Sequence, residues 1–284
     1  MIRNSFSVVM SVYHRDNADY FDRALQSITE NQTLLPTEIV LVCDGPLGEK
    51  LDSVIDKYQG EYPIFNIIRL PENKGLGNAL KVAVENSNNE IIARMDSDDV
   101  SIPNRFEQQL KYFADHNDID IVGGDITEFV NNEENIVGKR QVPVENNDIR
   151  KYMKTRCAMN HVTVMFRKEA IQSAGGYLDW FWNEDYYLWI RLCLKGAVFA
   201  NTGTVLVNVR VGEEMYQRRG GIQYFNSEFG LQKLMLKKGM IGLITFFCNV
   251  TKRFIVQLLL PNTIRGWVFK KLARTTQEDR NKWV

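Results

Sequence analysis

The chain has few cysteines, and no two of them are closely spaced. They are Cys43, Cys157, Cys193 and Cys248, so neither a Cys-x-x-Cys pair nor a zinc-binding spacing occurs. This excludes a disulfide framework and a zinc finger, and it favours reduced cysteines in a cytosolic compartment. Residues 1–16 also lack the unbroken apolar run and small-residue cleavage site of a secretory signal peptide, so we expect the protein to act in the cytoplasm.

Two glycine motifs of nucleotide-binding proteins are also absent. Gly75-Leu76-Gly77 lacks the third glycine of the dinucleotide fingerprint, and no Gly-Lys-Ser/Thr of a P-loop occurs. These absences exclude both motif-bearing classes. The segment around Gly75 could still place backbone N–H groups at the start of a helix near a phosphate or base, or it could simply lead into that helix.

No apolar run reaches the roughly 18–20 residues that a membrane span needs. The formal net charge of +0 excludes a chain that binds polyanions along its whole length. Residues 231–284, however, hold 11 Lys/Arg against 2 Asp/Glu, among two apolar clusters. This pattern predicts helices that lie on an anionic membrane surface. The alternative is a helix pair that packs on the rest of the protein or in a dimer; nucleic-acid binding is not expected, because no recognition motif accompanies the basic residues.

Short apolar runs alternate with helical patterns along the first half of the chain. Strands are predicted at residues 6–13, 37–45, 65–70, 90–96 and 119–125, with helices between them. This order is typical of an α/β protein with a mostly parallel sheet flanked by helices. A strand that runs into a helix follows at 163–171, then a helix from about Glu184 and late strands within 196–211. We predict a catalytic domain over residues 1–215 and a basic, helical C-terminal extension over 216–284.

Three carboxylates follow the predicted fourth strand within four residues: Asp96, Asp98 and Asp99. Open α/β sheets bind ligands at the carboxyl ends of their strands, and polar turn residues end the first three strands as well. An Asp-x-Asp directs alternate carboxylates at one point, and Mg²⁺ or Mn²⁺ typically takes one or two carboxylates together with substrate phosphates. The alternative is an Asx-turn or the N-cap of the next helix.

A second acidic segment, Asn183-Glu184-Asp185, precedes an amphipathic helix. An acid in the first helical turn is favourable for the helix dipole, so capping is one interpretation. A general base presented into a cleft is the other. Aromatic residues surround this segment, and they suit either the apolar faces of sugar rings or a protein core: Trp180, Phe181, Trp182, Tyr186, Tyr187 and Trp189.

Taken in order, these segments resemble a bacterial family 2 glycosyltransferase. The resemblance rests on FSVVMSVYHRD, VCDGP, NKGLGNAL, ARMDSDD, HVTVMFRKEAI and NEDYYLWIRLCLKG, and it covers about residues 6–212. It implies a GT-A fold and an inverting transfer that depends on Mn²⁺ or Mg²⁺. The stretch VNVRVGEEMYQRRGG further resembles bacterial enzymes that assemble O-antigen and exopolysaccharide repeat units.

The resemblance also implies roles for individual residues. Asp44 resembles the acid that meets the nucleotide base, Asp96 lies nearer the ribose, and Asp98 is the expected direct metal ligand. Asp185 resembles the catalytic base, with Glu184 and Asp99 as supporting acids. Further residues expected to bind the nucleotide sugar are Tyr13, Asn73, Gly75, Arg94 and Ser97. One departure is Ser11-Val12-Tyr13-His14, where many members carry Pro-x-Tyr-Asn.

Three arginines are candidates of a different kind. Arg210, Arg218 and Arg219 could belong to a mobile loop that closes on the diphosphate, since arginine forks suit phosphate oxygens. The alternative is a solvated or lipid-facing basic patch.

The expected reaction moves galactose or glucose from a UDP-sugar to GlcNAc- or GalNAc-diphospho-undecaprenol, with a β-1,3 linkage favoured. Its setting would be O-antigen or capsule/exopolysaccharide assembly at the inner face of the bacterial plasma membrane. One alternative is a sugar-nucleotide pyrophosphorylase, although the glycine-rich, arginine-containing loop of that class is missing after the first strand. The other is a non-catalytic, membrane-associated scaffold.

Overall fold

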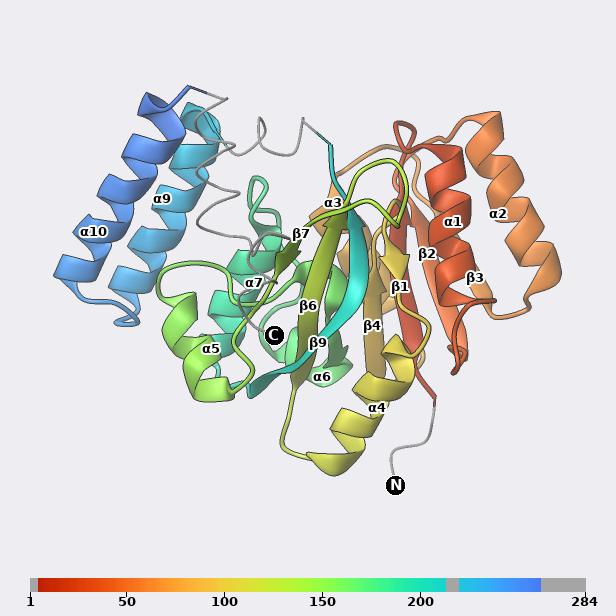
Figure 1. Ribbon diagram of the computed structural model, residues 1–284, viewed down its shortest axis with the longest axis horizontal. Helices are drawn as coiled ribbons and strands as arrows, with labels where there is room; N and C mark the ends of the chain where they lie inside the picture. Colours follow the sequence, from red (N-terminus) through yellow and green to blue (C-terminus); the bar gives the residue numbers. More distant parts are fainter. Residues whose placement is uncertain (1–4, 213–219, 262–284) are drawn as a thin grey trace.

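The computed structural model describes residues 5–212 and 220–261 (Figure 1). Within these ranges one mixed sheet has the strand order β3-β2-β1-β4-β8-β6-β9-β5, and β7 pairs with β6. The strands are β1 Ser7–Val12, β2 Glu38–Cys43, β3 Phe65–Arg69, β4 Ile91–Met95, β5 Val100–Ser101, β6 Ile121–Phe129, β7 Ile136–Arg140, β8 Met165–Arg167 and β9 Phe199–Arg210.

Over the described residues the sheet has four parallel and four antiparallel pairings, and the parallel ones join more residues. Strand β1 pairs in parallel with β2 and with β4, β2 with β3, and β6 with β9. Strand β8 is antiparallel to both of its neighbours, β4 and β6. The predicted fold class, a mostly parallel α/β sheet flanked by helices, is therefore confirmed.

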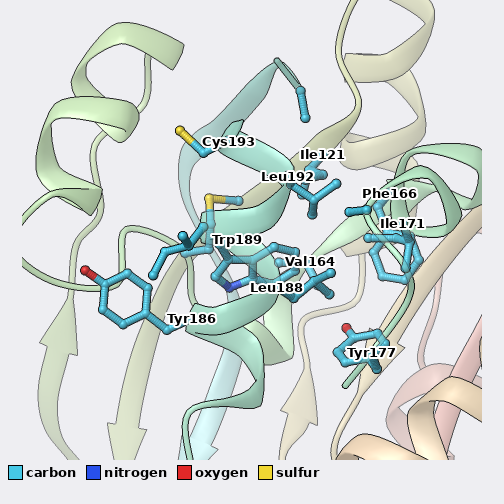
Figure 2. Close-up of a cluster of buried hydrophobic side chains, with 14 of the residues drawn as sticks. Ile121, Val164, Phe166, Ile171, Tyr177, Tyr186, Leu188, Trp189, Leu192 and Cys193 are labelled. Atoms are coloured by element: carbon cyan, nitrogen blue, oxygen red, sulfur yellow. The ribbon is translucent and has the colours of Figure 1, made fainter. Parts of the chain in front are cut away.

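Helices cover both faces of the sheet, because successive residues of each buried strand point to opposite sides. Val8 packs with α1 Ala18–Ile28, α2 Glu49–Glu61 and α4 Arg105–Asp115. Its neighbour Val9 packs in the other core, with α3 Leu76–Glu85, α5 Asn146–Met153, α6 Lys168–Ser173 and α7 Glu184–Leu194. Figure 2 shows the centre of this second core, where Trp189 of α7 is surrounded by apolar side chains from several elements.

The C-terminal helices pack on this second core. Helix α9 spans Ile222–Lys237, α10 spans Leu243–Phe254, and a π-helical turn follows at Ile255–Leu259. The two helices lie side by side next to α7 (Figure 1), and Leu231 and Met235 of α9 are fully buried in the core. The predicted extension is thus helical at Ile222–Lys237 and over 243–259, and its bounds of 216–284 stay a prediction. Among the described residues no helix is long and apolar enough to cross a membrane.

Most differences from the expected elements are small. Short strands β5 and β7 and helix α5 are additional, and the late strands of 196–211 form one continuous strand, β9. Two register shifts against β6 let β9 bend along its length. This bend carries its C-terminal end to β5, directly after the acidic segment.

Candidate active site

The carboxyl ends of β1, β2 and β4 meet at one edge of the sheet, since the three strands are adjacent and parallel. Next to this edge lies a cleft of ≈ 1220 Å³, which the start of α7 and parts of α9 and α10 also line. The structure brings eight of the predicted site residues together in its wall: Tyr13, Asp44, Asn73, Gly75, Asp96, Ser97, Asp98 and Asp185. The residues expected to bind the nucleotide sugar and the expected catalytic base therefore line the same cleft.

Asp44 holds the segment that leads into α3. Its two carboxylate oxygens accept hydrogen bonds from the backbone N–H groups of Lys74 at 2.8 Å and Gly75 at 2.9 Å. Gly75 has a φ of +87°, a conformation that favours glycine. At Gly45 a Cβ atom would come within 2.8 Å of the Asn73 backbone nitrogen, so a glycine is needed there too. Asp44 therefore fixes the loop that carries Asn73 into the cleft.

Asp96 forms a bidentate ion pair with Arg94. The Arg94 guanidinium donates to both oxygens of Asp96, with 2.7 Å for the Nη1–Oδ2 contact. Arg94 is buried and is not part of the cleft wall, so it acts on the site through Asp96. Arg105, also buried, donates to the Arg94 carbonyl oxygen at 2.7 Å and so stabilises the end of this strand.

Asp98 lies among other carboxylates. Burial, followed by the charges of Asp96 and Asp16, raises the pKa of Asp98 to about 6. Asp16 accepts hydrogen bonds from the Ser97 hydroxyl at 2.8 Å and from the Tyr13 N–H at 3.1 Å. Because the acidic segment is followed by β5, and Asn104 is the N-cap residue of α4, these acids do not cap the next helix.

Asp99 points away from the cleft and binds β9. Its Oδ1 accepts the backbone N–H of Arg210 at 2.8 Å, and burial raises its pKa well above the usual value. The Arg210 guanidinium donates to the carbonyl oxygens of Asp98 and Asn131 and lies over the Tyr20 and Phe129 rings. Arg210 is thus the last residue of a strand and supports the acidic segment from outside the cleft wall. Arg218 and Arg219 lie outside the described residues, so their loop role stays a prediction.

Asp185 and Glu184 form the first turn of α7 and both line the cleft. Asp185 accepts the Tyr186 N–H at 2.6 Å, and the Cys157 thiol lies 3.9 Å from its Oδ2. Burial, followed by the charge of Asp185, raises the pKa of Glu184 to about 7. Burial and the same charge raise the pKa of Cys157 to about 12, so this thiol stays protonated and is a poor nucleophile.

The aromatic residues near this segment divide into two groups. Tyr186 and Trp189 are buried in the core of Figure 2. Phe181 and Trp182 are exposed in the cleft wall. The core interpretation is therefore confirmed for Tyr186 and Trp189, and sugar binding by Phe181 and Trp182 stays a prediction.

The carboxylates of the cleft suit a divalent cation that takes only a few of its ligands from the protein. No cluster of three or more His, Cys, Asp or Glu residues within 5–212 and 220–261 is arranged to hold a metal alone. Asp98 nevertheless faces a cleft with Asp96 and Asp16 beside it, and Arg94 forms an ion pair with Asp96. A divalent ion that takes Asp98 and substrate phosphates fits this arrangement.

Two residues of the site are absent from the sequence-based prediction. Asp16 lies in the turn between β1 and α1, at the end of the segment FSVVMSVYHRD, and accepts a hydrogen bond from Ser97, but no role was predicted for it. Ser227 of α9 binds the turn before α7, and nothing in the sequence connects the two segments.

Comparison with known proteins identifies the class. The Glycosyl transferase family 2 matches residues 7–174, and the Glycosyl transferase family group 2 matches residues 91–259. The chain therefore belongs to glycosyltransferase family 2, and the predicted resemblance is confirmed.

Similar proteins agree with this family. An Escherichia coli UDP-Gal:α-D-GlcNAc-diphosphoundecaprenol β-1,3-galactosyltransferase is 36% identical over 269 residues, which is 95% of this chain and 96% of the relative. S. aureus TarS residues 1–349 with UDP-GlcNAc superpose with a TM-score of 0.65 at 16% identity, over 98% of this chain and 78% of that one. The mannosyltransferase PcManGT of Pyrobaculum calidifontis with GDP-Man and Mn²⁺ gives 0.62 at 14% identity, with the same two coverages. These structures support the GT-A fold.

Proposed function

We propose that the protein is an inverting hexosyltransferase that moves galactose or glucose from a UDP-sugar to a lipid-linked GlcNAc or GalNAc diphosphate. The observation that carries this proposal is that one cleft joins the Asp96–Asp98 edge to Asp185. The name of the E. coli relative, which matches almost the whole chain, supports UDP-galactose, a diphospho-undecaprenol acceptor and a β-1,3 linkage. Such a product belongs to O-antigen or exopolysaccharide assembly.

Asp185 is the proposed general base. It accepts the proton of the acceptor hydroxyl while that oxygen forms a bond to the anomeric carbon of the donor. The bond from this carbon to the β-phosphate oxygen breaks, and UDP leaves from the opposite face. One displacement of this kind inverts the anomeric centre, so an α-linked donor gives a β-glycoside.

On the donor side, Asp44, Asn73, Gly75 and Tyr13 are proposed to bind the nucleotide, and Asp96, Ser97 and Arg94 to hold or support its ribose and diphosphate. Asp98, with Asp96 beside it, would hold Mn²⁺ or Mg²⁺. When bound, the ion supplies positive charge for the departing diphosphate. The acidic donor set and the Mn²⁺ of the P. calidifontis structure support this proposal.

The C-terminal region, residues 216–284, is proposed to attach a catalytic domain of residues 1–215 to the inner face of the plasma membrane. Part of this region also completes the active site, since Tyr224, Glu228 and Arg253 line the cleft. Exposed apolar side chains of α10 support the membrane contact, and they are Leu243, Ile244, Phe247 and Phe254.

Different observations argue against the two alternative functions, a pyrophosphorylase and a non-catalytic scaffold. Membership of family 2 leaves a sugar-nucleotide pyrophosphorylase without support. A non-catalytic scaffold would not need Asp96, Asp98 and Asp185 in one cleft, and an activity assay separates it from an enzyme.

The direct test is transfer from UDP-galactose and UDP-glucose, with Mn²⁺, to GlcNAc- and GalNAc-diphosphates that carry a short alkyl chain. We expect Asp185→Asn to lower kcat by about 10²–10⁴-fold, because the proton acceptor is lost. Thermal stabilisation by UDP and Mn²⁺ should persist in this variant. The matched control is Asp56→Asn, an exposed position on α2. Normal turnover in Asp185→Asn, or an α-linked product by NMR, would refute the proposed mechanism.

A further inference from the structure

Two aromatic side chains of the active-site cleft remain without a role. Phe181 is 41% exposed and Trp182 is 52% exposed, and both line the cleft. Their rings stack on each other with centroids 4.6 Å apart and an interplanar angle of 24°. Since large aromatic side chains usually bury their surface, a stacked pair exposed beside the proposed base indicates a binding surface.

The backbone of Trp182 is held in an unfavourable conformation. Its φ is +53°, in the left-handed region that bulky residues avoid. Among the described residues only Asn131 shares a positive φ without being glycine, and asparagine tolerates it well. Strain of this kind persists only where the surrounding structure enforces it, and it concentrates at functional sites.

Helix α9 provides that enforcement. The Ser227 hydroxyl donates to the Phe181 carbonyl oxygen at 2.7 Å and accepts from the Asn183 side-chain amide at 3.0 Å. The Trp180 indole N–H donates to the Ser227 carbonyl oxygen at 3.1 Å. A Cβ atom at Gly230 would come within 2.8 Å of the Trp180 ring, so a glycine permits this close contact. The turn is therefore fixed on both sides of the exposed pair.

The position of the aromatic pair favours binding of the acceptor over binding of the donor. Leu178, Asp179 and Glu184 lie against Gly77 of α3, which is on the nucleotide side. Trp182 instead faces α9, where the Tyr224 ring lies 6.4 Å away. The aromatic pair therefore contacts α9, whereas its neighbours in sequence on both sides contact α3.

We propose that Phe181 and Trp182 form the acceptor subsite, on which the sugar ring of the acceptor stacks with its apolar C–H face. The ring would then present its hydroxyl to Asp185, three residues further along the chain. This inference rests on the proposed function and adds the residues that select and orient the acceptor. The exposed aromatic faces and the enforced turn, three residues before Asp185, favour a sugar ring over the flexible polyprenyl tail of the acceptor.

The test compares variants that keep the backbone conformation. Trp182→Gly and Trp182→Asn both tolerate a positive φ but remove the ring, whereas Trp182→Phe keeps an aromatic face. With the alkyl-diphosphate acceptors, we expect the first two to raise the acceptor KM by about tenfold or more, and Trp182→Phe to stay within about threefold. The donor KM and the slow hydrolysis of UDP-sugar without acceptor should not change, since the donor side is intact.

Three results would overturn the proposal. An unchanged acceptor KM in Trp182→Gly, with active wild-type enzyme, contradicts the subsite alone. An equal loss of donor hydrolysis places the pair on the donor side. Loss of binding to anionic vesicles, with a normal KM for the short-chain acceptor, assigns the pair to membrane contact instead. Wild-type protein that transfers to none of the acceptors would instead refute the proposed function, and the inference with it.

Discussion

At the scale of single residues, the two adjacent acids at the start of α7, Glu184 and Asp185, are expected to have different roles. Asp185 faces the cleft as the proposed base, and Glu184 carries a second carboxyl next to it. Burial and the Asp185 charge both disfavour an ionised Glu184, which raises its pKa to about 7. Glu184 therefore keeps its proton below neutral pH, and this limits like-charge repulsion at the start of α7.

The raised pKa of Glu184 has a consequence for stability. Below its ordinary pKa of 4.5 the group is protonated in both the folded and the unfolded state, so no difference arises. Between 4.5 and about 7 the folded state binds more protons, and stability falls as the pH rises. We expect Glu184→Gln to raise Tm relative to wild type at pH 8 and to leave it almost unchanged at pH 4.5. An equal Tm difference at both pH values in calorimetry would contradict this assignment.

The sequence predicted the residues that follow strands better than those within them. Asp44 and Asp96 directly follow apolar runs, Asp98 comes two residues after Asp96, and the carboxyl ends of adjacent parallel strands share an edge. Arg94 lies inside β4, and only the structure shows that its guanidinium pairs with Asp96 and is not part of the cleft wall. Arg210 ends β9, and its contacts with Asn131 and Phe129 depend on strand pairing that no local pattern reveals.

At the scale of elements, the turn before α7 depends on a helix that begins almost forty residues later. Ser227 of α9 binds both Phe181 and Asn183, and Asn183 immediately precedes the two acids. This contact joins the proposed base and the proposed acceptor subsite to one rigid helix. A positioned base loses much of its effect when it shifts by as little as about 1 Å.

Ser227→Ala tests this connection. The change leaves the Asn183 amide and the Phe181 carbonyl oxygen with only their long contact to each other at 3.5 Å, so we expect a loss of about 1–3 kcal/mol in the free energy of unfolding. We also expect kcat to fall by about tenfold or more, because the base is displaced, while UDP affinity is retained. Ser227→Thr, which keeps the hydroxyl, should restore much of the activity. The control is Ser53→Ala, an exposed serine whose hydroxyl bonds within α2; equal effects of both alanine variants would contradict the role of Ser227.

Element positions were predicted where periodicity is strong. Strands β1, β2, β3, β4 and β6 follow from apolar runs, and α7 from its amphipathic spacing. Strand β5 has only two residues and exists because β9 pairs with it. The contact of α9 with Trp180 requires Gly230, because a Cβ atom there would clash with the ring. The sequence alone does not show which side chain packs against a glycine within a helix.

At the scale of the whole molecule, the C-terminal helices have two distinct faces. One face is part of the core, since Leu231 and Met235 are fully buried and the Asn249 side chain donates to the Lys154 carbonyl oxygen at 2.9 Å. Deleting the chain after residue 231 would therefore expose core and damage the cleft. The other face of α10 is apolar and open, and Ile244 is 82% exposed. The packing of the extension on the rest of the protein is thus seen directly, and membrane contact stays a proposal.

Point substitutions on α10 test the membrane contact without removing core. Ile244 and Phe247, the latter 63% exposed, lie outside the cleft wall, so Ile244→Glu/Phe247→Glu should leave transfer to short-chain acceptors intact. Each apolar side chain inserted into a bilayer contributes about 1.5–3 kcal/mol, so we expect binding to anionic vesicles to weaken by at least about tenfold. Leu35→Glu, an exposed apolar position elsewhere on the molecule, is the matched control and should keep vesicle binding. The basic residues of the same region should make wild-type binding weaker at high salt. If the double variant sediments with vesicles as well as wild type does, the membrane-binding surface lies elsewhere on the protein.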